Sequence, residues 1–286
     1  MRHGVYVTEN PTPLLPPVRT SASVVVAFGT APVHLKLNEE RNVNRLNLCA
    51  NYAEAVELLG YHKDWEKYTL CEVMDSQFSK FAVSPLILVN VLDPDKHRQT
   101  VAAHSAAIFG REASLGPDIM LDTVVVKTEA DALCVRDVDY SVAYDDEGNA
   151  IVTALEGGAL AESSSLKADF ARLDPSMVTS DDIVGGIDIL TGDAEGLELL
   201  DQIFPKFRLI PGLLIAPGWS HNPEVAAVMD AKIQNVNGLF KGICLVDIPS
   251  GAEDADRWSK VIEWKSRNNI SSPFQIACWP LVRLGD

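Results

Sequence analysis

The sequence predicts an α/β core domain with a mostly parallel sheet, a small β-rich domain inserted into it, and an extended N-terminal arm. Three observations support this fold class. Short, continuous apolar runs alternate with helical patterns on both sides of the chain's middle, which is typical of parallel strands covered on both faces. The middle itself lacks tryptophan and shows strand patterns. The first twenty residues join a β-branched segment to a proline-rich one.

Length and charge limit what the chain can be. It has 286 residues, which at about 150 residues per domain predicts roughly two domains. Its 24 basic and 40 acidic residues give a net charge of −16. Such a surface repels phosphate backbones and anionic lipid headgroups, so we expect no nucleic-acid partner. The N-terminus has no apolar signal segment and the apolar runs are too short to span a bilayer, so we expect synthesis in a cytoplasm and no membrane insertion.

Residues 1–20 predict an arm that leaves its own domain. Residues 4–9 alternate and are β-branched, which indicates a strand. Four prolines follow within residues 11–17 and block both helical and ladder hydrogen bonding, so this stretch is expected to be an extended tether. The alternative is a first strand that folds back onto its own sheet.

Residues 21–97 predict the first part of the core domain. Residues 23–29 and 85–92 are apolar runs expected to be buried strands. Between them, residues 51–59 predict a short helix and residues 64–81 a longer one. This strand–helix–strand order favours a parallel sheet.

Residues 98–178 predict the inserted β-rich domain. They hold −8 of the −16 net charge and none of the five tryptophans. Residues 145–149 read as a hairpin turn, because glycine and asparagine suit its positive-φ positions. The expected strands are residues 123–128, 140–144, 150–154 and 163–170.

Residues 179–286 predict the second part of the core domain. Helices are expected at residues 194–204 (stopped by Pro205), 222–240 and 254–267, and strands at 210–216, 243–248 and 274–279. Because the chain stops straight after a buried-looking strand, we expect further C-terminal sequence to be missing. The five cysteines are widely spaced, without metal-ligand spacing, and are expected to be buried free thiols.

Ser220 and His221 form the most suggestive chemical pair. They follow a predicted parallel strand, where open α/β sheets place ligands, and Asp247 ends the next strand. An α/β hydrolase-like enzyme using these three residues is therefore the alternative function. The G-x-S-x-G turn of such enzymes is absent, however, and Asn222 before a proline is typical of a helix N-cap.

Other polar clusters have structural explanations. Asp181 and Asp182, and likewise the acids at residues 253, 254 and 256, are expected to lie at helix starts, where they complement the helix dipole. No phosphate-binding loop and no metal-ligand spacing of histidines occurs. We therefore expect no cofactor, no metal and no catalytic residue.

A series of short motifs resembles the contractile phage tail sheath family. These motifs occur in order across almost the whole chain. They are HGVYVTE at 3–9, PPVRTSA at 16–22, GTAP at 29–32, DYSV at 139–142 with Tyr144, Asp145 and Gly148, DIVGG at 182–186 with Thr191, Gly192, Gly196 and Leu197, PG at 211–212, and APGWSH at 216–221.

The resemblance implies a structural protein and not an enzyme. Sheath subunits stack as rings around a tail tube and contract to drive it through a host envelope. The implied partners are other copies of the chain, the tail tube protein, and baseplate and tail terminator proteins, in a virion tail assembled in a bacterial cytoplasm. In this family, arms add strands to neighbouring subunits, which assigns the arm strand to Gly4, Val5, Tyr6, Val7 and Thr8. By this resemblance, we expect the family's C-terminal domain to be missing from this chain.

Overall fold

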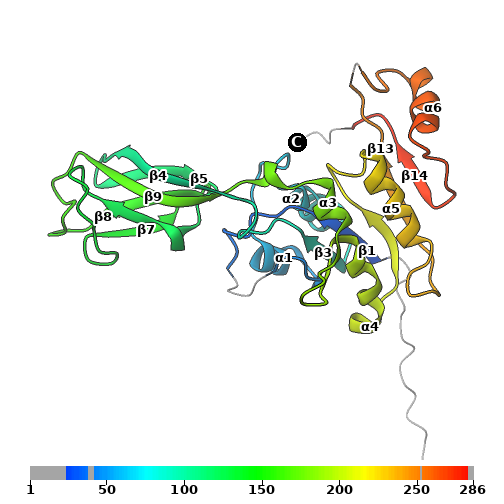
Figure 1. Cartoon of the computed structure of the whole chain (residues 1–286), viewed down its shortest axis with the longest axis horizontal. Coiled ribbons are helices and arrows are strands. Elements are labelled where there is room, and N and C mark those ends of the chain that lie inside the picture. The colour runs from blue at the N-terminus through cyan, green and yellow to red at the C-terminus, as the bar shows by residue number, and fades with distance from the viewer. Residues whose placement is uncertain (1–23, 38–41, 252, 283–286) are drawn as a thin grey trace, which may run out of the picture.

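The structure, a computed structural model, describes residues 24–37, 42–251 and 253–282 (Figure 1). The predicted arm strand at residues 4–9 lies outside the described residues. An α/β core lies on one side of the molecule and an elongated β lobe, residues 98–173, on the other. Within the described ranges, no helix is long and apolar enough to cross a membrane.

The core is built on one six-stranded sheet. Its order is β14 (Gln275–Cys278), β13 (Ile243–Asp247), β12 (Pro211–Ile215), β1 (Val24–Gly29), β3 (Leu86–Asn90) and β2 (Asn47–Cys49). Every adjacent pair is parallel except β2 with β3. All residues of β1 and β3 are buried, as their continuous apolar runs predict. The mostly parallel α/β sheet is therefore confirmed, and β2 is an addition that the sequence did not indicate.

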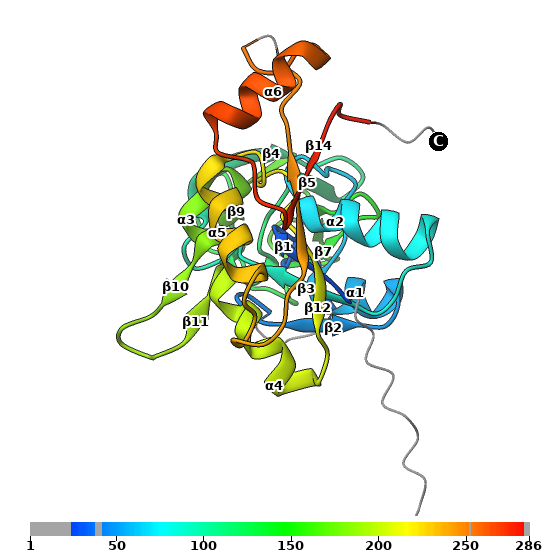
Figure 2. The same cartoon turned by 90° about the vertical axis from the view of Figure 1, so that its right-hand side faces the viewer.

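Helices cover this sheet and close its connections (Figure 2). They are α1 (Tyr52–Leu59), α2 (Thr69–Met74), α3 (Ser180–Val184), α4 (Ile203–Phe207), α5 (Pro223–Ile233) and α6 (Trp258–Arg267). The α1 helix begins where the Asn51 side chain accepts the Glu54 N–H and ends at Gly60, whose φ is 75°. Both ends match the predicted helix.

The helix predicted at residues 64–81 is wrong in its first part. The α2 helix begins only at Thr69 and continues as a π-helix over Asp75–Lys80. Thr30, after the end of β1, explains the late start. Its hydroxyl donates to the Lys67 carbonyl and accepts the Thr69 N–H, and its carbonyl accepts the Leu70 N–H. These contacts with the strand end replace the first helical turn.

The second half of the core also differs from the predicted boundaries. Residues 194–195 are strand β11 (Ala194–Glu195), followed by a 3₁₀-helix and then α4. Pro205 lies inside α4 and does not stop it, because the N–H groups of a helix's first turn need no helical partner. The α5 helix ends at Ile233 and not at residue 240, and α6 starts at Trp258 and not at residue 254.

The β lobe contains two three-stranded antiparallel sheets, ordered β4-β9-β6 and β5-β8-β7. Their strands are β4 (Arg98–Ala107), β5 (Glu112–Pro117), β6 (Val125–Lys127), β7 (Tyr140–Tyr144), β8 (Asn149–Ala154) and β9 (Ser165–Leu173). A hydrophobic cluster within residues 106–170 fills the lobe, and a second cluster fills the α/β core. Arg98 pairs with Leu173, so the chain enters and leaves the lobe side by side.

Candidate functional site

Ser220 and Asp247 meet at the C-terminal ends of β12 and β13. The Ser220 hydroxyl is buried, with 1% of the residue exposed, and donates to the Asp247 carboxylate at 2.8 Å. The same oxygen accepts the Asp247 N–H at 3.1 Å. His221 is exposed and makes no hydrogen bond with Ser220 in the described part of the chain. A serine nucleophile needs a hydrogen-bonded base, so this pair joins two strand ends and does not form a triad.

The turn between β12 and α5 depends on its small and aromatic residues. Asn222 caps α5 by accepting the Glu224 N–H, as predicted. Gly218 has a φ of 79°, and a Cβ there would lie 2.9 Å from the Thr69 methyl carbon. Trp219 packs against the core cluster. The APGWSH string therefore shapes a strand-to-helix turn packed on α2.

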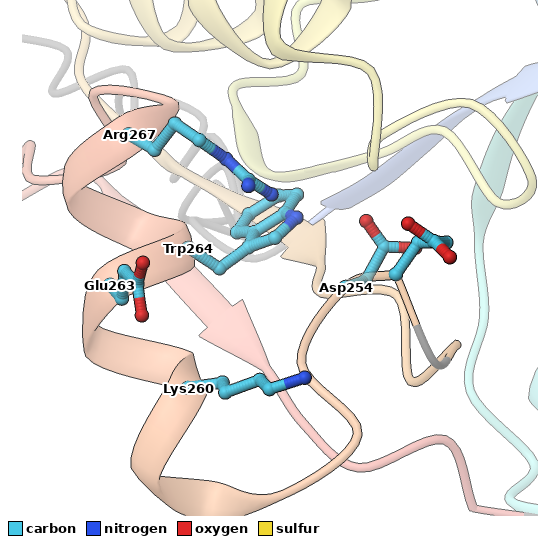
Figure 3. Close-up of a pocket in the computed structure, with 6 residues that line it drawn as sticks. Asp254, Lys260, Glu263, Trp264 and Arg267 are labelled. Atoms are coloured by element: carbon cyan, nitrogen blue, oxygen red, sulfur yellow. The ribbon is translucent and has the colours of Figure 1, made fainter.

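The predicted acidic caps are half confirmed. Asp182 lies in the first turn of α3, and its carboxylate accepts the N–H of Thr179 in a capping box. The acids at residues 253 and 254 precede α6, so placing them in its first turn is wrong. They line a cavity of about 150 Å³ beside α6, together with Lys260, Glu263, Trp264 and Arg267 (Figure 3). This lining mixes both signs of charge and offers no single-sign ligand site.

We next consider the possible metal ligands and the cysteine thiols. Among the residues that the structure describes, no group of three histidines, cysteines or acids is placed to hold a metal ion. All five cysteines are free, and four are buried. Burial raises the pKa of the Cys49, Cys71 and Cys244 thiols to about 12, so they stay protonated at neutral pH.

A polar cluster that no sequence pattern predicted lies where the lobe meets the core. Asp118, after β5, is buried and accepts a 2.7 Å hydrogen bond from the Tyr68 hydroxyl. It also pairs with Lys67 at 3.1 Å. The His34 ring lies 5.8 Å from the Tyr144 ring, and burial lowers the pKa of His34 to about 4. These contacts bridge residues up to 110 positions apart, so no local pattern could have found them.

One edge of the core sheet has an unpaired strand. Within the described residues, β14 pairs only with β13, and its outer edge carries no further strand. Ile276 on β14 is half-exposed, and Leu281 and Val282 beyond it are exposed. Exposed edge strands can pair with a strand from another chain.

The chain is similar in sequence to a known protein. No family model matches it. It is 23% identical, over 99% of its length, to the tail sheath protein of Burkholderia phage BcepMu. The chain is homologous to a phage tail sheath protein. This confirms the resemblance seen in the motifs. The chain spans 56% of that relative's length.

Proposed function

We propose that the chain is a structural subunit of a contractile phage tail sheath. In this role it self-assembles into helical or stacked-ring tubes around the tail tube and contracts to drive the tube through the host envelope. The observation that supports this most is the similarity to a sheath protein, which extends over both the α/β core and the β lobe. The two hydrogen bonds between Ser220 and Asp247 support this proposal further, because the Ser220 hydroxyl bonds to a carboxylate and not to a histidine base, as a catalytic triad would require.

The subunit's proposed organisation has three parts. Residues 1–20 form the arm, residues 21–97 with 179–286 form one core domain, and residues 98–178 form an inserted, outward-facing domain. Two separate hydrophobic clusters support the division, as does the pairing of Arg98 with Leu173 at the lobe's base. An outward position would leave the net −8 of residues 98–178 solvated.

The arm is proposed to connect subunits. Gly4, Val5, Tyr6, Val7 and Thr8 would add a strand to a sheet edge of a neighbouring copy. The outer edge of β14, which pairs with no further strand among the described residues, supports this proposal. Tail tube, baseplate and tail terminator proteins are the further proposed partners.

Electron microscopy of the product of the whole gene tests the proposal. We expect tubes of regular width that shorten and widen on contraction. A serine-reactive probe should leave Ser220 unlabelled. Dispersed particles without tubular order, or covalent labelling of Ser220, would contradict the sheath role.

A further inference from the structure

A cluster of aromatic rings and cations lies where the parallel strands β12, β13 and β14 begin, near α4 (Figure 1). The Phe204 and Phe240 rings are 4.8 Å apart and join the two connections that make up its centre. Leu239 beside them is 78% exposed. We call this the basic–aromatic patch; its members are Phe204, Lys206, Phe207, Arg208, Leu239, Phe240, Lys241 and Phe274.

Each cation of the patch lies over a ring and not beside a carboxylate. Lys206 lies 5.1 Å from the Phe207 ring centre, Arg208 lies 5.8 Å from that of Phe204, and Lys241 lies 5.6 Å from that of Phe274. None of the three forms an ion pair with any described residue. Glu198 and Asp201, from the adjoining 3₁₀-helix, pair with Lys232 instead. The three cations are grouped in a chain of net charge −16. Lys206 also lines a cavity of about 520 Å³ with Asp188, Asp193 and Glu195, but forms no ion pair with any of these acids.

A second exposed element has the complementary chemistry. The hairpin of β10 (Gly186–Ile187) and β11 protrudes from the core (Figure 2). At its tip, Ile189 is 98% exposed and Leu190 is 95% exposed. The tip is nevertheless ordered by its own bonds, because the Asp188 carboxylate accepts the N–H groups of Leu190 and Thr191. Ile189 and Leu190 are therefore exposed to solvent in an ordered turn. Exposed apolar side chains of this kind are often covered by a binding partner.

We propose that the hairpin tip of one copy docks on the basic–aromatic patch of a second copy. Ile189 and Leu190 would cover Leu239 and the phenylalanine rings. Asp193, exposed and without an ion pair in the described residues, would approach the patch cations. This inference rests on the proposed sheath function, since that function supplies the second copy.

The geometry favours another copy over the tip's own chain. The near-complete exposure of Ile189 and Leu190 shows that the tip does not touch the patch of its own molecule. Asp193 and Lys206 line one cavity of the same molecule, so the base of the hairpin lies beside the patch, although Ile189 and Leu190 project away from it. A contact in which each copy offers its tip to one neighbour and its patch to another is head-to-tail. Contacts of that type repeat into rings or helical filaments, which are the assemblies proposed above.

Cross-linking tests the contact directly. Copies carrying Leu190→Cys are mixed with copies carrying Leu239→Cys, both in a Cys278→Ser background, and oxidised in the assembled state. We expect a mixed dimer that neither variant gives alone. Leu133→Cys, at a 69% exposed site on the lobe, replaces Leu239→Cys as the control. A mixed dimer no more abundant than in this control would overturn the inference.

Charge and apolar variants provide a second measurement. Arg208→Glu with Lys241→Glu should weaken self-association by about tenfold, and adding Asp193→Lys should restore part of it. Ile189→Ser with Leu190→Ser should weaken it by about a hundredfold. The matched control, Lys265→Glu with Arg267→Glu on α6, should leave it unchanged; equal effects of the two cation pairs would overturn the inference.

The two proposals can fail separately. Regular tubes without the specific cross-link would leave the sheath function standing and overturn the tip-to-patch contact. The specific cross-link in material that never forms tubes would support the contact and contradict the sheath function.

Discussion

His34 shows how one residue couples the junction of lobe and core to pH. Its ring packs between Tyr68 and Tyr144, near Asp118 and His62, and its buried Nδ1 has no hydrogen-bond partner among the described residues. Burial lowers its pKa to about 4, although the charge of Asp118 acts in the opposite direction. The folded protein therefore holds His34 neutral at pH values where an unfolded chain would protonate it.

We predict that His34 makes the protein less stable between pH 6.5 and pH 4. In that window the unfolded state binds the extra proton, so the free energy of unfolding falls as pH falls. The full difference is about 3 kcal/mol. Urea unfolding of the parent and of His34→Leu across this range measures it, because acids common to both proteins cancel in the difference. Parallel pH profiles of the two proteins would contradict the prediction.

Asp118 supports a second prediction at the same junction. Asp118→Ala leaves the buried Tyr68 hydroxyl without its acceptor and Lys67 without its partner. We expect a loss of about 2 kcal/mol in the free energy of unfolding. Asp131→Ala is the control, because Asp131 pairs with Lys167 at an exposed site and should cost less than about 1 kcal/mol. Similar losses in both variants, by urea unfolding, would show that the junction contributes no more than a surface pair.

At the scale of elements, apolar patterning was enough for the buried strands. The runs at residues 23–29, 85–92, 210–216, 243–248 and 274–279 each contain a strand of the parallel sheet. Burial on both faces explains the continuous apolar sequence of β1 and β3, whereas β13 and β14 are partly exposed. The β4 strand was missed for the converse reason: only one of its ten residues is buried, so no alternation marks it. The start of α2 was missed because contacts with Thr30, and not local propensity, determine it.

Only those parts of the candidate site that are formed by residues close together in the sequence could be predicted. The Asn222 cap and the Asp182 cap depend on neighbours in sequence and were found. The basic–aromatic patch joins residues 204, 240 and 274, which become neighbours only through the order β14-β13-β12. The spacing of residues in the sequence does not indicate that strand order, because the order arises from the packing of the whole sheet.

Two glycines allow a prediction about the turn between β12 and α5. Gly218 and Gly157 have nearly equal φ angles, 79° and 78°, but a Cβ at Gly157 would meet nothing within 4 Å. Alanine at either position should cost about 1 kcal/mol for the backbone, and Gly218→Ala should cost more because its methyl would press on Thr69. Thermal unfolding compares them; equal losses would show that Thr69 moves away freely.

For the whole molecule, the central question is whether the arm serves assembly or folding. The described core begins at Val24 with a strand that is already paired on both sides. Its hydrophobic cluster includes residues from five strands of the six-stranded sheet, and Ala277 of β14 packs against it. A tether at residues 11–17, stretched at roughly 3.1 Å per residue, would carry an arm strand about 20 Å away. That reach is suited to a neighbour's sheet edge.

Removing or blocking the arm should therefore separate assembly from stability. Deleting residues 1–15 should change the melting temperature of this chain by less than about 2 °C, because 1 kcal/mol shifts it by only a few degrees at this size. In the product of the whole gene, Val5→Pro with Val7→Pro should abolish tubes in electron micrographs, because proline cannot donate a ladder hydrogen bond. Val5→Thr with Val7→Thr is the matched control and should assemble, since threonine keeps the strand preference. Regular tubes from the proline variant, or a large fall in melting temperature on deletion, would show that the arm belongs to the fold of its own subunit.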